Sequence, residues 1–199
     1  FAVLPAALSF QKERRTGYLR VAVFRTGKRQ YVLAKSVAVF LSGFLVAFLP
    51  LITNVLLVSA FIPTTIPQVN YNFYTYVSFG GLWADLFFSK PWIYVGLYVL
   101  LDSLFAGLLA LMGFAFSFFI RYGIVAALTP FFLCMAVDYA AKILDSIGST
   151  AENSFSFELS PFGWMRASHI GLPVYGWVVA AELLLFTIFS LSVIFLRGS

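Results

Sequence analysis

The chain has 199 residues, of which 61% are hydrophobic, 19% aromatic and 11% charged. A soluble domain carries about 25% charged residues, and one core could not bury so much apolar surface in a chain of this length, so the composition excludes an ordinary soluble globular protein. The net charge of +5 does not indicate nucleic-acid binding, because the cations gather beside hydrophobic stretches, where they set membrane topology and meet anionic lipid headgroups.

The first ten residues, FAVLPAALSF, are apolar and are expected to be the closing turns of a membrane span that begins before Phe1. They have neither a basic region nor a small-residue cleavage site, so they do not resemble a signal peptide. We therefore expect the numbering to start partway into a longer polypeptide.

Residues 11–35 differ sharply from their neighbours, because they hold eight of the thirteen basic residues. By the positive-inside tendency this segment is expected on the cytoplasmic side. Within it, GYLRVAVF (Gly17 to Phe24) is too short to span a membrane and too apolar for a solvated loop. Such a piece favours a protein groove or a membrane surface, and Gly17 could supply the turn that lets a short helix lie crosswise to the preceding span.

Four apolar stretches qualify as membrane spans, for which roughly 20 residues are needed: about 36–62, 91–119, 123–139 and 174–196. Alternation then places the loops 63–90 and 140–173 outside, and part of 140–160 is expected to form short surface helices. Pro50 and Pro130 lie within spans and predict kinks or breaks. We expect the four tryptophans to mark the outer membrane interface. The absence of a repeat or linker indicates one all-α membrane domain over 1–199.

Three polar side chains within the spans are candidate pathway residues: Asn54, Asp102 and Glu182. Asp102 lies about 16 Å into its span, where an unpaired carboxylate is costly. It is expected either to be a structural lock, hydrogen-bonded to Asn54 or a serine, or to line a transport path. The small residues that follow it at helical spacing are expected to face another helix or protomer; they are Ser103, Ala106, Gly107, Ala110, Gly113 and Ser117.

The remaining ionisable residues do not favour catalysis. Asp138 and Lys142 are four apart and are expected to form a helical ion pair. Cys134 is the single cysteine and His169 the single histidine, so no metal cluster or Cys–His pair is expected. We expect neither an enzyme nor a cofactor bound by this chain.

The segment ERRTGYLRVAVFRTGKRQYVLAK resembles the first cytoplasmic connection of type-2 ATP-binding-cassette (ABC) exporter permeases. The resemblance covers about 25 residues in motif and the rest of the chain in topology. It implies a six-helix transmembrane domain whose first span, and part of the second, precede this sequence. It also implies an ATPase-coupling role for eight residues: Glu13, Gly17, Tyr18, Leu19, Phe24, Arg25, Tyr31 and Lys35.

The resemblance further implies a permease subunit of an ATP-driven exporter in the plasma membrane, of the kind found in the bacterial inner membrane. Its partners would be cytoplasmic ABC ATPase subunits, which bind ATP and Mg²⁺, and a second permease copy or paralogue. The chain has no phosphate-binding G-x-x-x-x-G-K-[ST] loop of its own. A proton-coupled secondary transporter and a non-transporting membrane scaffold are the alternatives.

Overall fold

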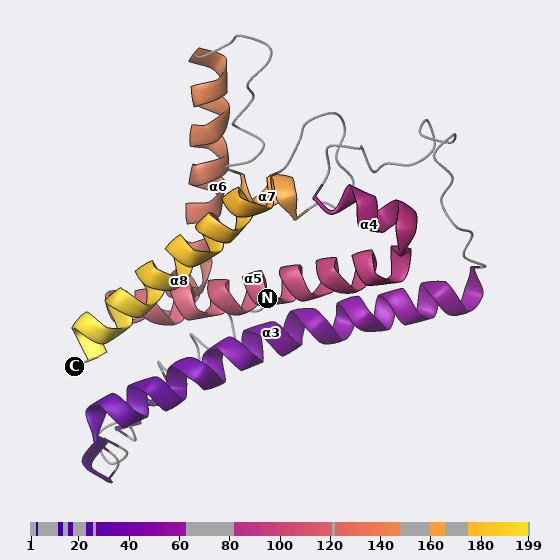
Figure 1. Cartoon of the computed structure of the whole chain (residues 1–199). Coiled ribbons are helices and arrows are strands. Elements are labelled where there is room, and N and C mark those ends of the chain that lie inside the picture. Colours follow the sequence, from indigo (N-terminus) through magenta and orange to yellow (C-terminus); the bar gives the residue numbers. More distant parts are fainter. Residues whose placement is uncertain are drawn as a thin grey trace. The chain divides into compact units, whose positions relative to one another are not determined.

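The computed structural model describes residues 3, 12–13, 16–17, 23–25, 27–62, 82–120, 122–147, 160–165 and 175–198. These residues are 88% helical and include no strand. The labelled helices are α3 (Lys28–Phe61), α4 (Ala84–Ser89), α5 (Pro91–Phe116), α6 (Gly123–Ile147), α7 (Pro161–Trp164) and α8 (Gly176–Gly198) (Figure 1). The all-α prediction is thereby confirmed for the described part of the chain.

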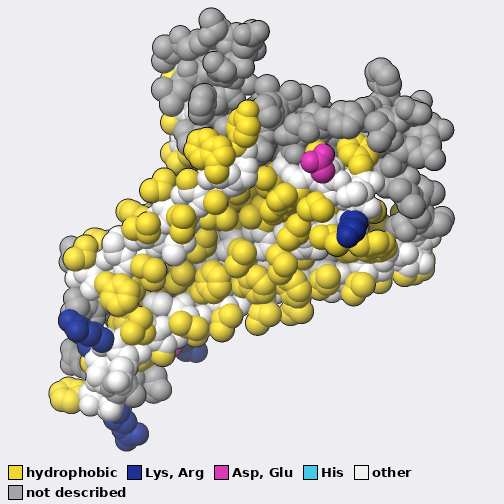
Figure 2. All heavy atoms as spheres, viewed as in Figure 1, with side chains coloured by type: hydrophobic (Ala, Val, Ile, Leu, Met, Phe, Trp, Pro, Cys, Tyr) yellow, Lys and Arg dark blue, Asp and Glu magenta, His cyan; other side chains and the backbone are white. Residues whose placement is uncertain are grey.

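The four long helices, α3, α5, α6 and α8, are long and apolar enough to cross a membrane. Hydrophobic side chains cover most of the described surface in Figure 2. Only lipid or a partner protein could shield these side chains from water. Two-thirds (67%) of the most apolar stretch of α5 is buried, against 0% for that of α3. The described residues thus form four long apolar helices compatible with a polytopic membrane protein, and of these α5 is the most buried and α3 is widely exposed.

The helix ends differ from the predicted span ends. α3 begins at Lys28 rather than near Ser36, and α6 continues past Tyr139 to Ile147. Each extension contains charged residues, such as Lys28 and Arg29 in α3 and Lys142 in α6, that end an apolar run but are compatible with a helix. Hydropathy therefore marked the end of the apolar run rather than the end of the helix. Pro50 and Pro130 do not break their helices, which run on through both positions.

The chain divides into two compact units, which we name for their charge. The basic unit comprises Phe1–Leu49, Ser103–Phe132 and Leu183–Ser199. It holds ten of the thirteen lysines and arginines but one of the eight acidic residues. The acidic unit comprises Pro50–Asp102 and Leu133–Glu182, and holds the other three cations and seven acids. This asymmetry follows the positive-inside tendency, with the basic unit expected to face the cytoplasm.

Within the basic unit, α3 and α5 pack closely through small residues. A Cβ added to Gly43 would lie 2.5 Å from Ala110 Cβ and 3.1 Å from the Ala106 carbonyl oxygen, and one on Gly107 would lie 2.8 Å from the Phe40 ring. A Cβ on Gly113 would meet the Val3 side chain. The predicted small-residue face of α5 thus meets helix α3 and the N-terminal segment of the same chain, which confirms its packing role.

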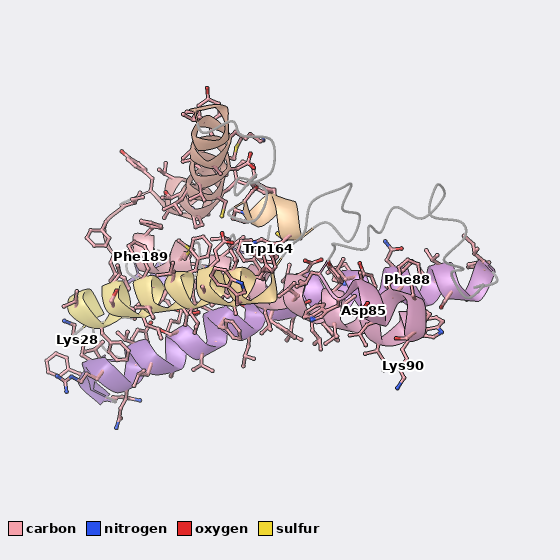
Figure 3. The ribbon with its side chains drawn as sticks, turned by 45° about the horizontal axis from the view of Figure 1, so that its top comes forward. Lys28, Asp85, Phe88, Lys90, Trp164 and Phe189 are labelled. Atoms are coloured by element: carbon pink, nitrogen blue, oxygen red, sulfur yellow. The ribbon has the colours of Figure 1, made fainter. Side chains whose placement is uncertain are left out.

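A core of buried side chains extends from this crossing within the basic unit. Phe114 and Ala115 of α5 are fully buried there, together with Val39 of α3 and Ile194 of α8. α3, α5 and α8 run side by side here (Figures 1 and 3). The start of α3 and the end of α8 therefore pack into one core. The segment that precedes α3 is thus joined to a helix that this core holds in place.

Candidate functional site

Glu13 ties the segment before α3 to the first turns of that helix. Its Oε2 accepts a hydrogen bond from the Tyr31 hydroxyl at 2.5 Å, and its Oε1 accepts one from Lys35 Nζ at 2.5 Å. The ion pair is largely shielded, with 23% of the Glu13 side chain and 16% of the Lys35 side chain exposed. Three of the eight predicted coupling residues thus meet in one network, which we call the Glu13 staple.

Two glycines in left-handed backbone conformation separate the parts of this segment. Gly17 has φ +73° and Gly27 has φ +79°, a region in which a side chain is disfavoured. Gly17 follows a turn in which the Thr16 amide bonds to the Lys12 carbonyl at 2.9 Å. The Gly27 amide bonds to the Val23 carbonyl at 3.0 Å, and α3 begins at the next residue. The expected turn at Gly17 is present, and Gly27 provides a second one that the sequence analysis missed.

The repeated tripeptide Arg-Thr-Gly, at residues 15–17 and 25–27, was the available signal for this second turn. Each copy ends in one of the left-handed glycines. The predicted coupling residues Tyr18 and Leu19 lie between the two copies and outside the described residues. The prediction that Gly17 to Phe24 form a short helix crosswise to the preceding span also concerns residues outside the described part.

Phe24 and Arg25 project from a short helical turn, Val23–Arg25, just before the second glycine. The Phe24 side chain is 94% exposed, the highest value among the exposed large hydrophobic residues of the described part. Arg25, Lys28 and Arg29 are also exposed. Phe24 and these cations are therefore accessible to a partner protein or to lipid.

The intramembrane candidates lie in the acidic unit, where Asp102 occupies the middle of α5. Its Oδ1 is buried without a hydrogen-bond partner among the described residues. Asn54 is exposed on α3 and does not supply the predicted hydrogen bond. The described contacts therefore do not include the structural lock that we expected with Asn54.

Glu182 of α8 has one partner. Its Oε2 accepts a hydrogen bond of 2.7 Å from Nε1 of Trp164, a fully buried residue of α7, whereas its Oε1 has no partner in the described part of the chain. Figure 3 shows Trp164 beside the first turns of α8. The expectation that Trp164 lies in an interfacial belt is wrong, because the indole N–H requires an acceptor and finds a buried one. Trp92 and Trp177 are 56% and 67% exposed, as a belt requires.

α7 is held on its other side as well. Ser160, which precedes it, donates a hydrogen bond of 2.5 Å to Asp138 Oδ1, and Asp138 Oδ2 pairs with Lys142 at 2.7 Å. The predicted Asp138–Lys142 pair is confirmed, and the contact with Ser160 is new. α7 is therefore fixed within the acidic unit by two carboxyl groups, one from α6 and one from α8.

Comparisons with protein-family models, with curated proteins and with solved structures find no match. The assignment of function therefore depends on the residues themselves. Among the described residues no group of three or more His, Cys, Asp or Glu side chains is placed to hold a metal ion. Two features remain to be explained by function: the stapled, exposed segment of the basic unit and the two incompletely bonded carboxyl groups of the acidic unit.

Proposed function

We propose that this chain is the membrane-spanning permease subunit of an ATP-driven exporter. In this proposal it has the six-helix type-2 ABC architecture. It pairs with a second permease copy or a paralogue in the plasma membrane, and moves a hydrophobic or amphipathic substrate. ATP and Mg²⁺ are bound by separate cytoplasmic ATPase subunits.

The Glu13 staple is the observation that supports this proposal best. A permease driven by a separate ATPase must transmit movement from a cytoplasmic contact to its spans. Phe24 is 94% exposed and precedes the first residue of α3 by four positions, while Glu13 fixes the start of the same segment to Tyr31 and Lys35 of α3. A displacement of this segment by a docked ATPase would therefore reach α3 through two attachments, Gly27 and the Glu13 staple.

The proposed partner contact combines an aromatic anchor with surrounding cations. Buried aromatic anchors contribute strongly at interfaces, and cations steer association with an acidic partner. Phe24 would enter a groove of the ATPase subunit, with Arg25 at its edge. A docked Phe24 would bury nearly its whole side chain, which stabilises the complex by about 2 kcal/mol.

Affinity purification in mild detergent tests this proposal. The full-length tagged protein is expressed in its own host, and co-purifying proteins are identified by mass spectrometry. We expect a subunit with a phosphate-binding loop, whose ATPase rate changes when the purified permease is added back. Phe24→Ala should reduce the recovery of this subunit by about tenfold or more.

Phe61→Ala is the matched control, because Phe61 is 83% exposed at the opposite end of α3, in the acidic unit. It removes the same aromatic surface and should leave recovery of the ATPase unchanged. Recovery of no such subunit, or equal loss in the Phe24 and Phe61 variants, would contradict the proposal.

Asp102 and Glu182 each have one buried oxygen without a partner among the described residues, which favours a second candidate, a proton-coupled carrier. Ionisable groups inside spans commonly mark ion or proton pathways. In vesicles, a carrier of this kind would keep transporting after ATP is depleted and would stop when the proton gradient is collapsed. The exporter that we propose would show the opposite dependence.

A further inference from the structure

We propose that Asp102 and the aromatic side chains beside it bind an amphipathic organic cation, that is, an apolar molecule with a single positive charge. The inference rests on the proposed transport of a hydrophobic or amphipathic substrate, and it names the chemical class of that substrate. Four aromatic side chains take part, and we call them the aromatic column: Trp83 at the start of α4, Phe87 of α4, and Tyr94 and Tyr98 of α5.

The aromatic column leads along α5 to Asp102. Tyr94, Tyr98 and Asp102 follow one another at intervals of four residues, so they lie on successive turns of one side of the helix. The ring centroids of Tyr94 and Tyr98 are 4.8 Å apart. Phe87 meets Tyr94 edge to face at 5.2 Å. Trp83 meets Tyr98 edge to face at 5.8 Å. Helical side chains lean toward the N-terminus, so the Asp102 carboxyl group lies over the turn that carries Tyr98.

Asp102 has no partner of opposite charge among the described residues. Its Oδ1 is buried without a hydrogen bond, and the Tyr98 hydroxyl donates instead to a backbone carbonyl oxygen at 3.5 Å. The described cations of the acidic unit are Lys90 and Lys142, and Lys142 pairs with Asp138. Lys90 lies about 18 Å from Asp102 along the helix axis, beyond the reach of its side chain. Because a carboxylate within a span is costly without a positive partner, an ionised Asp102 favours a bound cation.

The surroundings of Asp102 favour an organic cation over a metal ion. Ca²⁺ and Mg²⁺ require several oxygen ligands, and no group of three acidic, histidine or cysteine side chains in the described part of the chain is placed to supply them. Aromatic rings attract organic cations and also pack against their apolar groups. Asp102, Trp83 and Phe87 are each partly exposed, so a ligand can reach both the carboxyl group and the column.

The backbone of Trp83 adds independent support. Its φ is +59°, in the left-handed region that a bulky side chain disfavours, and it begins α4 without a side-chain capping bond. Strain of this kind lowers stability and is concentrated at functional sites. Here it accompanies the placement of the indole ring against Tyr98, one turn from Asp102, which supports a binding role for the aromatic column.

Binding of tetraphenylphosphonium to the purified full chain, without any ATPase, tests this inference. This cation and the anion tetraphenylborate have nearly the same size and shape but opposite charge. Equilibrium dialysis in uncharged detergent measures the binding of both, with empty micelles as the blank. We expect the wild-type chain to bind the cation saturably and about tenfold or more tighter than the anion. Asp102→Asn keeps the shape of the side chain and should weaken binding of the cation by about tenfold or more.

Asp85→Asn is the matched control, because it removes the carboxylate of an exposed residue on α4, in the same unit (Figure 3). It should leave the affinity for the cation within about twofold of wild type. Circular dichroism verifies the folding of both variants. A second measurement needs no variant: dicyclohexylcarbodiimide modifies carboxyl groups in apolar surroundings, and bound tetraphenylphosphonium should protect Asp102 from it, as peptide mass spectrometry would show.

Three results would overturn the inference. The first is that the wild-type chain does not bind the cation saturably or binds the two ions equally, which would leave Asp102 as a protonated structural group. The second is equal loss of affinity in Asp102→Asn and Asp85→Asn, and the third is unchanged modification of Asp102 in the presence of the cation. Because no ATPase is present, these results are independent of the co-purification test. An ATPase that co-purifies with a chain that binds no cation would retain the exporter and exclude this class of substrate.

Discussion

Replacing Lys35 by Met tests whether the Glu13 staple holds the cytoplasmic segment on α3. Met keeps an unbranched side chain and a high helix propensity, so the substitution removes mainly the charge. Lys35 Nζ lies 2.5 Å from Glu13 Oε1, and its side chain is 16% exposed. Charged hydrogen bonds in shielded positions contribute about 1.5–3 kcal/mol, so we expect a loss of about 2 kcal/mol in the local opening free energy.

Hydrogen exchange measures this loss directly. A change of about 2 kcal/mol corresponds to exchange that is about 30-fold faster, since each 1.4 kcal/mol is tenfold. The informative amide is that of Thr16, which bonds to the Lys12 carbonyl in the stapled segment and is not part of α3. Exchange is followed by mass spectrometry with the full chain in detergent micelles.

Lys142→Met is the matched control, because Lys142 also pairs with an acid at 2.7 Å but is 68% exposed. Exposed pairs at this helical spacing contribute about 0.3–0.5 kcal/mol, so local exchange should rise by about twofold or less. Unchanged exchange at Thr16 in Lys35→Met, or equal effects of the two lysine substitutions, would refute the reasoning.

Two further substitutions probe the packing of each unit. Gly43→Ala places a Cβ 2.5 Å from Ala110 Cβ and should lower the free energy of unfolding by about 1–3 kcal/mol. Gly96→Ala meets no atom within 4 Å and should raise the free energy of unfolding by up to about 1 kcal/mol. The two variants should therefore shift the thermal midpoint in opposite directions, and shifts of the same sign would contradict this prediction. Trp164→Phe removes the donor to Glu182 Oε2 and should lower the free energy of unfolding by about 1–3 kcal/mol. Glu182→Gln should then be less destabilising in the Trp164→Phe variant than in the wild-type chain. Strictly additive effects of the two substitutions in thermal melts would argue against the bond.

The transmembrane helices could be predicted from sequence because lipid requires long apolar runs, and such runs are visible without a structure. Their ends could not be predicted in the same way. Lys28–Lys35 and the residues from 140 to 147 continue their helices outside the apolar stretch, where only local propensity and tertiary contacts act. The Asp138–Lys142 pair followed directly from the spacing of four.

The contacts of the candidate site were harder to predict. Glu13, Tyr31 and Lys35 were singled out only by resemblance, and their meeting spans 18 and 22 residues of chain. It depends on the turns at Gly17 and Gly27, whose φ values a sequence does not give. Trp164 was placed at the membrane interface because tryptophans are common there, but its N–H is paired with Glu182, a long-range contact that composition cannot reveal.

Glu13 differs in its bonding from the two carboxyl groups within the spans, Asp102 and Glu182. In the basic unit, Glu13 uses both oxygens in bonds that hold the chain together. In the acidic unit, Asp102 and Glu182 each keep a buried oxygen without a partner in the described part of the chain, although both lie on spans where such an oxygen lowers stability. At Asp102 an apolar residue would avoid that cost, and no described hydrogen bond offsets it. At position 182 an apolar residue would also remove the acceptor of the Trp164 indole N–H, so stability explains one oxygen of Glu182 but not the other. In either of the two transport functions proposed above, a substrate or ion could meet these oxygens.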